Sequence, residues 1–443
     1  MKWPNGSVLP WSMHYRSQSA VPGRGEALAA CANPRLIDQD AAVVRGLTAD
    51  WVRRAPKDEP WRTGASSPGR SAGTRIIEGE TAQGLSHTQK WDLLSSFLRQ
   101  HGREGIAYAT LQAGMEYFIA PSGYIAYTRV RHPLFARRPK RMVFSDPICA
   151  PEDVPDLVRR FLEWDRRAAF CIVSEECAQT LRSLGFKANC IGYEPLIAIQ
   201  TYNTQGNWKE LDLIKRARNE ARREGLIIRE ENGSSLGLRR QELQAFSTRW
   251  ISSRKINDRE VWLYARRPVF DHEEGVRKFV AYDAGRQVAG FAFYDPMYRG
   301  GRVFGYSANI VRCDERRFGR LATAMHMEAL DTFRAEGAEV FNLLLAPFGK
   351  LERGAFNDDW GARRLFGLSA RFGNAIYNFK GLSFHKSKYR GVERPLYFAS
   401  NSFLPGGDIY LAFATAGIAD GCWGTIGKLL RGWLRAGRAS GSS

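Results

Sequence analysis

Two polar residues, Asn309 and Arg312, stand at the end of the apolar strand candidate GYSANIVR. Side chains alternate along a strand, so Asn309 and Ser307 are expected on one face and Ala308 and Ile310 on the other. Arg312 is expected just past the strand end, close to the start of the next helix. Polar groups at such an edge suit a small polar ligand, and an arginine suits a phosphate. A strand edge capped by an asparagine would show the same pattern.

Three further side chains are candidates for a general base: Asp295, His326 and His385. Carboxylates and imidazoles are frequent proton acceptors in enzymes, provided that they lie within hydrogen-bond distance of the reacting group. Spacing along the chain does not supply that geometry, so the sequence favours none of the three.

A cationic helix is predicted in the segment WKELDLIKRARNEARREG. Its cations are Lys215, Arg216, Arg218, Arg222 and Arg223. Lys215, Arg218 and Arg222 stand at i, i+3 and i+7, so they share one helix face, which the other two broaden. Such a stripe suits a phosphate backbone, because each contact releases condensed counterions. The alternative is a solvent-exposed helix between domains, in which glutamates of the same segment partly pair these charges.

A second group of cations alternates with aromatic residues in YNFKGLSFHKSKYRGVERPLYFAS. Lys386 and Lys388 stand there among Tyr377, Phe384 and Tyr389. This mixture can hold a phosphate together with a stacked base or an acyl chain. A basic loop that leads into a final strand would look similar.

The charge of the chain agrees with a phosphate-bearing partner. Its 443 residues include 65 Lys and Arg against 46 Asp and Glu, a formal net charge of +19. This surplus favours nucleic acid or an anionic membrane surface, although a merely soluble basic protein would also show it. No run of about 18 apolar residues predicts a helix that spans a membrane.

Cysteine and histidine usage argues against a structural metal. The seven cysteines are scattered without a CxxC spacing, and the seven histidines are equally dispersed. We therefore expect no zinc site and no other metal. Scattered, unpaired thiols and the absence of an apolar secretion signal favour a cytoplasmic protein.

The expected helices and strands form two mixed α/β units of similar order. Residues 1–85, rich in Gly, Pro, Ser, Ala and Arg, are expected to be a largely disordered basic arm. The first unit (86–205) begins with a helix and includes the strand candidate GIAYAT. The second unit (206–400) includes the cationic helix and the strand candidate AEVFNLLL. Residues 401–443 are expected to form a C-terminal tail.

This tail carries an amphipathic pattern in GCWGTIGKLLRGWLRAGR. The apolar face of the predicted helix consists of Trp423, Ile426, Leu430, Trp433 and Leu434. The opposite face is wholly basic, which is typical of a helix that lies in the plane of a membrane. The alternative is a terminal helix whose apolar face packs on the domain.

The ordered motifs RMVFSDP, IGYEPLI, LIKRARNEARREG, GYSANIVR, FNLLLAPFGKLE and FKGLSFHKSKY resemble the soluble catalytic part of phosphatidylglycerol lysyltransferases. The resemblance covers about residues 100–400. It implies two tandem acetyltransferase-like (GNAT) folds joined by a basic helix. It also implies transfer of an amino acid from aminoacyl-tRNA, as co-substrate, to a hydroxyl or amine of an anionic lipid such as phosphatidylglycerol. No cofactor is needed, and we expect a peripheral enzyme on the inner face of the cell membrane.

Roles follow from this resemblance. We expect Arg312 to bind a phosphate or the tRNA terminus, and Asn309 to orient the donor amino acid. The cationic helix, with Lys386 and Lys388, would hold tRNA or lipid phosphate. The family carries an aspartate where this chain has Asn309, and the amide removes both a charge and a base. The multi-helix membrane portion that usually precedes this domain is not found in the sequence, so the amphipathic tail is expected to replace it.

Two alternatives stay open. The segment RRFGRLA partly resembles the pyrophosphate-binding loop of coenzyme-A-dependent acetyltransferases, which would make the chain a GNAT N-acyltransferase. A non-catalytic lipid- or RNA-binding relative is the other alternative, with Asn309 marking lost chemistry.

Overall fold

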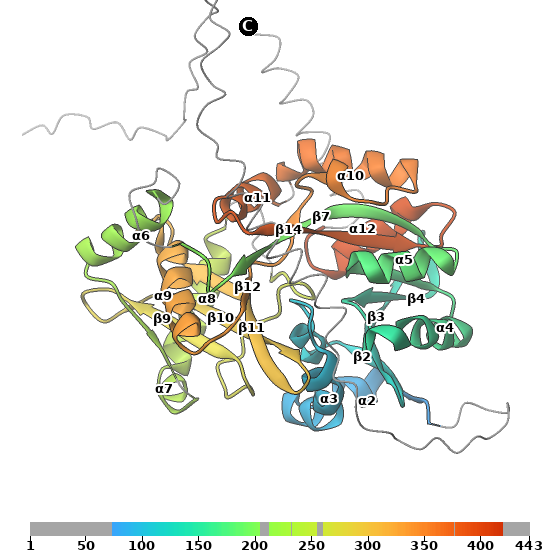
Figure 1. Cartoon of the computed structure of the whole chain (residues 1–443), viewed down its shortest axis with the longest axis horizontal. Helices are drawn as coiled ribbons and strands as arrows, with labels where there is room; N and C mark the ends of the chain where they lie inside the picture. Colours follow the sequence, from blue (N-terminus) through green and yellow to red (C-terminus); the bar gives the residue numbers. More distant parts are fainter. Residues whose placement is uncertain (1–72, 204–211, 232, 255–259, 376, 420–443) are drawn as a thin grey trace, which may run out of the picture. The chain divides into compact units, whose positions relative to one another are not determined.

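The computed structural model describes residues 73–203, 212–231, 233–254, 260–375 and 377–419, and it confirms a mixed α/β fold (Figure 1). The strands of the first half are β1 (Arg75–Ile77), β2 (Glu116–Ala120), β3 (Gly123–His132), β4 (Ala136–Phe144), β5 (Ile148–Cys149), β6 (Ala168–Val173) and β7 (Lys187–Ala198). Its helices are α2 (Gly79–Gln83), α3 (His87–His101), α4 (Val154–Trp164) and α5 (Glu175–Ser183).

The second half is likewise built of strands and helices. Its strands are β8 (Ile227–Glu230), β9 (Arg277–Tyr282), β10 (Val288–Arg299), β11 (Arg302–Cys313), β12 (Val340–Asn342), β13 (Ala346–Pro347) and β14 (Val392–Ser400). Its helices are α6 (Asp212–Arg223), α7 (Gly233–Leu238), α8 (Arg240–Ser252), α9 (Leu321–Ala335), α10 (Trp360–Phe372), α11 (Phe379–Ser387) and α12 (Pro405–Thr415).

The two halves share one sheet. Its order is β1-β2-β3-β4-β6-β14-β7-β12-β11-β10-β9-β8, with β5 paired to β3 and β13 to β7. In each half three antiparallel strands are followed by a helix and a strand parallel to the third: β4 with β6, and β11 with β12. The last strand of the chain, β14, then lies between β6 and β7 of the first half, and β7 pairs with β12 of the second. Each half therefore completes the sheet of the other.

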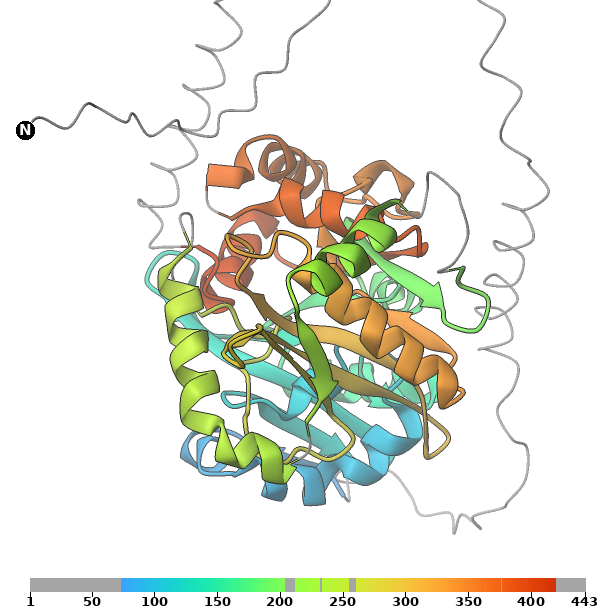
Figure 2. The ribbon, with the colours of Figure 1, turned by 90° about the vertical axis from the view of Figure 1, so that its left-hand side faces the viewer.

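Helices cover both faces of this sheet, as the apolar periodicity predicts. On one face of the first half, α4 and α5 pack their apolar stripes on the strands, whereas α3, α10 and α12 cover the other face. In the second half α9 covers one face and α8 the opposite one. The cationic helix α6 lies beside α9 (Figure 2) and buries Ile214 and Ala217.

Local signals explain several helix ends. Ser86 caps α3: the backbone N–H of Gln89 donates to its Oγ over 3.2 Å, and the Ser86 N–H donates to Gln89 Oε1 over 2.8 Å. This reciprocal pair satisfies two amide groups that have no partner within the helix. Asp359 caps α10 with a single hydrogen bond, which its carboxylate accepts from the Ala362 N–H over 2.8 Å.

Residues 75–83, which the sequence placed in the disordered arm, instead form β1 and α2. β1 takes its backbone hydrogen bonds from β2, with Arg75 opposite Ile119. The Glu78 carboxylate accepts from the Tyr127 hydroxyl over 2.9 Å. These partners are distant in sequence, which is why local composition did not reveal the order.

Two strand predictions are wrong in part. GIAYAT contributes to a 3₁₀ helix at Tyr108–Leu111, and AEVFNLLL keeps only β12 as a strand. Beyond β12 the backbone of Leu344 takes φ 59°, which interrupts the pairing before β13 begins. Short apolar runs are compatible with a strand or a helix, so periodicity alone cannot separate the two.

The amphipathic tail segment with Trp423, Ile426, Leu430, Trp433 and Leu434 lies outside the described residues. Among the residues that are described, none of the helices is long and apolar enough to span a membrane. Nor do the described side chains include a His, Cys, Asp and Glu cluster that could hold a metal ion.

Candidate active site

Asn309 occupies a bulge in β11. Phe293 of β10 pairs with Ile310, and the next residue, Tyr294, pairs with Ala308, so Asn309 has no partner in this ladder. The extra residue reverses the alternation of side chains. Ala308 packs in the core beneath α9, whereas Ile310 packs on the opposite face beneath α8. The sequence prediction that these two side chains share a face is therefore wrong.

The Asn309 side chain is buried, with 6% of its surface exposed. Its Oδ1 accepts a hydrogen bond from the backbone N–H of Arg266 over 2.8 Å. Its Nδ2 has no acceptor among the described groups. A buried donor without an acceptor is costly, so such an atom is a natural contact for a bound molecule.

A buried network of charges surrounds this amide. The Arg266 guanidinium donates to Asp295 over 2.7 Å and to Glu273 over 2.6 Å. Lys278 Nζ lies 2.8 Å from Glu273, and the Arg266 guanidinium carbon lies 5.5 Å from the centre of the Tyr108 ring. The sequence did not indicate Arg266 or Glu273, because nothing in their local spacing marks a residue that pairs far along the chain.

Asp295, one of the general-base candidates, is engaged by this network. Both of its carboxylate oxygens accept from Arg266 Nε, at 2.9 and 3.0 Å. Burial raises the pKa of Asp295, and the nearby Arg266 opposes that rise. In this arrangement the carboxylate holds Arg266, whose backbone in turn holds Asn309.

Arg312 lies inside β11, which continues to Cys313, and not past the strand end as the sequence predicted. Its side chain is buried on the α8 side, where its guanidinium donates to Ser247 and to the Glu260 carboxylate. The guanidinium carbon lies 5.3 Å from the centre of the Trp250 ring. Asn309 and Arg312 are thus neighbours in sequence whose side chains bind different partners.

The segment in which cations alternate with aromatic residues, 377–400, forms the helix α11 and then β14. The alternative of a basic loop leading into a final strand did not predict this helix. Lys386 Nζ donates to the backbone carbonyls of Leu344 and Leu345 over 3.1 and 2.9 Å. Burial lowers the pKa of Lys386 to about 7. Lys388 is exposed, with its Nζ 4.2 Å from the centre of the Phe384 ring. Lys388 is the more exposed of the two lysines, as expected for a phosphate contact, whereas Lys386 is half-buried.

Of the two histidine candidates, His385 lies in α11 and His326 in α9. His385 Nε2 is 3.3 Å from the Tyr389 hydroxyl, which donates to Thr323 Oγ1 over 2.9 Å. His326 Nδ1 is 3.0 Å from the Tyr294 hydroxyl, and its ring centre lies 5.8 Å from that of Tyr389. Burial lowers the pKa of His326 to about 3 and that of His385 to about 4. Both imidazoles are therefore neutral near pH 7.

The cations of α6 differ in exposure: Arg216, Arg222 and Arg223 are exposed, whereas Lys215 and Arg218 are half-buried. Carboxylates accompany several of these cations. Arg216 pairs with Asp212 over 2.8 Å, and Arg218 with Asp331 over 2.5 Å. Arg223 lies 3.0 Å from Glu224, whereas Arg222 is exposed. The stripe predicted from the sequence is present, but its charge is partly compensated. Its role in binding tRNA or lipid phosphate stays a prediction.

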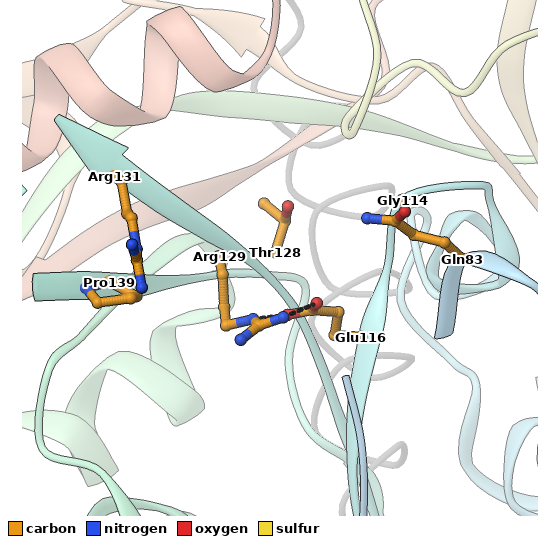
Figure 3. Close-up of a pocket in the computed structure, with 7 residues that line it drawn as sticks. All are labelled: Gln83, Gly114, Glu116, Thr128, Arg129, Arg131 and Pro139. Carbon is orange, nitrogen blue, oxygen red and sulfur yellow. Dashed lines mark hydrogen bonds and ion pairs between the residues drawn. The ribbon is translucent and has the colours of Figure 1, made fainter. Parts of the chain in front are cut away.

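A polar hollow of about 380 Å³ lies away from these residues, on the first half of the sheet (Figure 3). It is lined by Gln83, Gly114, Glu116, Thr128, Arg129, Arg131 and Pro139. Glu116 and Arg129 form an ion pair in its wall, with Nε 2.7 Å from Oε2. The sequence did not indicate this hollow.

The pKa of Lys386 makes the stability of the fold depend on pH. Because burial lowers this pKa from 10.5 to about 7, the unfolded chain binds a proton here between these pH values and the folded chain does not. The free energy of unfolding of the native chain should therefore rise with pH in this window, relative to that of Lys386→Met. Urea denaturation of both proteins at several pH values measures the difference. A difference that stays constant across the window would contradict the prediction.

The sequence and the fold are similar to those of known proteins. Residues 95–400 match the family model described as phosphatidylglycerol lysyltransferase, C-terminal. A solved C-terminal domain (DUF2156), attributed to a lysylphosphatidylglycerol synthetase from Agrobacterium fabrum, is similar with a TM-score of 0.60 and 21% identity, covering 76% of this chain and 100% of that one. L-PGS from Bacillus licheniformis is similar with a TM-score of 0.58 and 19% identity, covering 74% and 96%.

A curated relative, an uncharacterised protein of Corynebacterium glutamicum, is 22% identical over 330 residues, or 72% of this chain. The chain spans 40% of that relative's length. At these identities the solved structures establish a shared fold. The family model covers well over half of the chain and includes β11, α9 and α11. The chain therefore belongs to the phosphatidylglycerol lysyltransferase C-terminal family.

Proposed function

We propose that the protein transfers an amino acid from aminoacyl-tRNA to a hydroxyl of an anionic lipid such as phosphatidylglycerol. Membership of the family and the GNAT-like acyltransferase fold support an aminoacyl-lipid transferase at the level of the family. In this chain the proposal is supported by the bulge of β11, where the buried Nδ2 of Asn309 has no acceptor among the described groups.

The proposed reaction exchanges one ester for another. The lipid hydroxyl oxygen attacks the carbonyl carbon of the aminoacyl ester, the bond from that carbon to the tRNA ribose oxygen breaks, and the proton of the lipid hydroxyl passes to the ribose oxygen. The exchange is nearly thermoneutral, so orientation of the two substrates and stabilisation of the oxyanion would supply most of the rate.

The residues of this chain have distinct proposed roles. Asn309 would orient the donor amino acid through its Nδ2–H, since its Oδ1 is already held by Arg266. Arg312 would bind a phosphate or the end of the tRNA. The exposed cations of α6 and Lys388 would contact tRNA or lipid phosphate. The resemblance places an aspartate at position 309 in the family, so the donor amino group would be held differently here.

The test is incorporation of radiolabelled amino acids into lipid. Purified protein is incubated with charged total tRNA and liposomes with or without phosphatidylglycerol, and the lipid is extracted into organic solvent. We expect label in the lipid phase that requires phosphatidylglycerol and is lost after RNase treatment, and the labelled amino acid identifies the donor. If no amino acid labels any lipid, the proposal is wrong. Transfer gained only by Asn309→Asp would show that the family's carboxylate is required.

A further inference from the structure

The turn between β3 and β4 and the turn before α12 place four large apolar side chains in solvent. The exposed fractions are 66% for Leu134, 40% for Phe135, 93% for Phe403 and 74% for Leu404. We call these four residues the apolar tip. Isolated exposed apolar side chains are common, but a group of four on two adjacent turns indicates a contact surface.

The two turns are held together by specific contacts. The ring centres of Phe135 and Tyr410 of α12 lie 5.4 Å apart, and Lys140 Nζ donates to Ser402 Oγ over 2.6 Å. A Cβ on Gly407 would lie 3.0 Å from the Phe135 ring, so the start of α12 approaches this ring closely. Figure 1 shows α12 on the same side of the molecule as β3 and β4. The apolar tip is therefore one surface, built from segments about 270 residues apart in the sequence.

Exposed arginines stand in the segments that adjoin the apolar tip. Four exposed arginines, here called the arginine rim, have no carboxylate partner among the described residues: Arg131, Arg137, Arg138 and Arg166. Arg166 belongs to this surface because its backbone carbonyl accepts from Asn401 Nδ2 over 3.1 Å. Neither 130–139 nor 401–407 contains an Asp or Glu. Lys140, which is paired with Asp408, lies beneath the surface.

We propose that the apolar tip and the arginine rim dock the protein on the anionic surface of a phospholipid bilayer. Large apolar side chains that enter the acyl boundary, ringed by cations that meet the head-group phosphates, have the chemistry of a peripheral membrane contact. A protein partner would have to bury four arginines and supply an acidic match for each, whereas an anionic bilayer offers phosphates around every apolar insertion. Arg131 of the arginine rim also lines the polar hollow of Figure 3.

This inference rests on the proposed function in one respect. An acceptor lipid lies in a bilayer, so the protein must meet that surface to reach it. The docking itself can be measured without any transfer, which keeps failure of the docking distinct from failure of the proposed function.

Hydrogen–deuterium exchange of the full chain, with and without vesicles, tests the docking directly. With vesicles of phosphatidylcholine and phosphatidylglycerol we expect slower exchange in peptides that cover 131–138 and 401–406, and with pure phosphatidylcholine a much smaller effect. Exchange that is unchanged in both peptides would overturn the proposal, whatever other segments bind. Slower exchange that follows protein concentration in the absence of vesicles would indicate a second copy of the chain as the occupant, and would also overturn it.

Flotation of matched variants measures the vesicle-bound fraction of each protein. Leu134→Ser/Phe403→Ser should reduce the vesicle-bound fraction at least fivefold. Its control is Leu238→Ser/Val303→Ser, which changes two exposed apolar residues elsewhere. Arg137→Gln/Arg138→Gln should weaken binding more than Arg286→Gln/Arg302→Gln, although both pairs remove the same charge. Equal binding of each pair and its control would refute the docking surface.

Where transfer is observed, a kinetic comparison separates docking from chemistry. Leu134→Ser/Phe403→Ser should lose transfer to phosphatidylglycerol in vesicles while retaining transfer to a monomeric short-chain phosphatidylglycerol. Equal loss on both substrates would place these residues in the chemistry and not in the docking surface.

Discussion

Arg312→Ala is expected to lower aminoacyl transfer to lipid by about 100-fold or more, because it removes the fixed cation that is proposed to bind a phosphate or the end of the tRNA. The guanidinium is held by Ser247 and Glu260 on one side and by the Trp250 ring on the other. A side chain held from several directions keeps its orientation without a substrate, which is the property that a group binding a phosphate or a tRNA terminus needs. The RNase-sensitive label in extracted lipid measures the effect.

The fold should survive this substitution. The Glu260 side chain is 27% exposed, so water can solvate its carboxylate once the arginine is gone. Arg312→Lys, which keeps a cation but cannot bridge both partners, should retain intermediate activity. Arg316→Ala is the control: Arg316 is exposed and donates to the Ser253 carbonyl over 2.8 Å. Unchanged turnover in folded Arg312→Ala would refute the assignment.

Arg266→Met is expected to lower the free energy of unfolding by about 3–5 kcal/mol, because it leaves the buried Asp295 carboxylate without its hydrogen-bonded cation. Glu273 also loses Arg266 but keeps its ion pair with Lys278. The Arg266, Asp295 and Glu273 side chains are each exposed by 3% or less. Neither carboxylate is accessible to water in the folded chain. Urea denaturation followed by circular dichroism measures the loss.

A neighbouring residue provides the matched control. Arg267 is exposed, with its guanidinium carbon 5.6 Å from the centre of the Trp262 ring, so Arg267→Met should cost about 1 kcal/mol or less. Arg266→Met/Asp295→Asn should recover part of the stability, since the carboxylate that lost its cation is then replaced by a neutral amide. A loss in Arg266→Met no larger than in Arg267→Met would show that the network does not stabilise the fold.

The candidate site was predicted from the sequence only in part. The sequence indicates Asn309 and Arg312 as polar residues at the end of a strand candidate, and the structure places both in β11. The bulge that separates their surroundings was not predicted, since it depends on the register with β10. Arg266, Glu273 and Glu260 were missed because their partners are set by the path of the 260–273 segment between the halves. The roles of the predicted residues in transfer stay predictions.

Within the fold, the sequence by itself determined the elements whose apolar pattern is strong. The stripe of Val154, Leu157, Val158 and Phe161 determines α4, and the uniformly apolar run AAFCIV determines β6. Such a pattern indicates which side of a helix or strand is buried, and each segment shows it without reference to the rest of the chain. The repeated order of strands and helices in the two halves follows from them.

Only the tertiary structure decided which segments pair. β14 inserts between β6 and β7, and β1 adds to the edge of β2. The two turns of the apolar tip also pack together. Each of these contacts joins residues that are far apart in the chain. The physical reason is that an apolar face or an unpaired strand edge specifies the need for a partner but not its identity. Several segments can satisfy that need, and the choice among them is made by the packing of the whole chain.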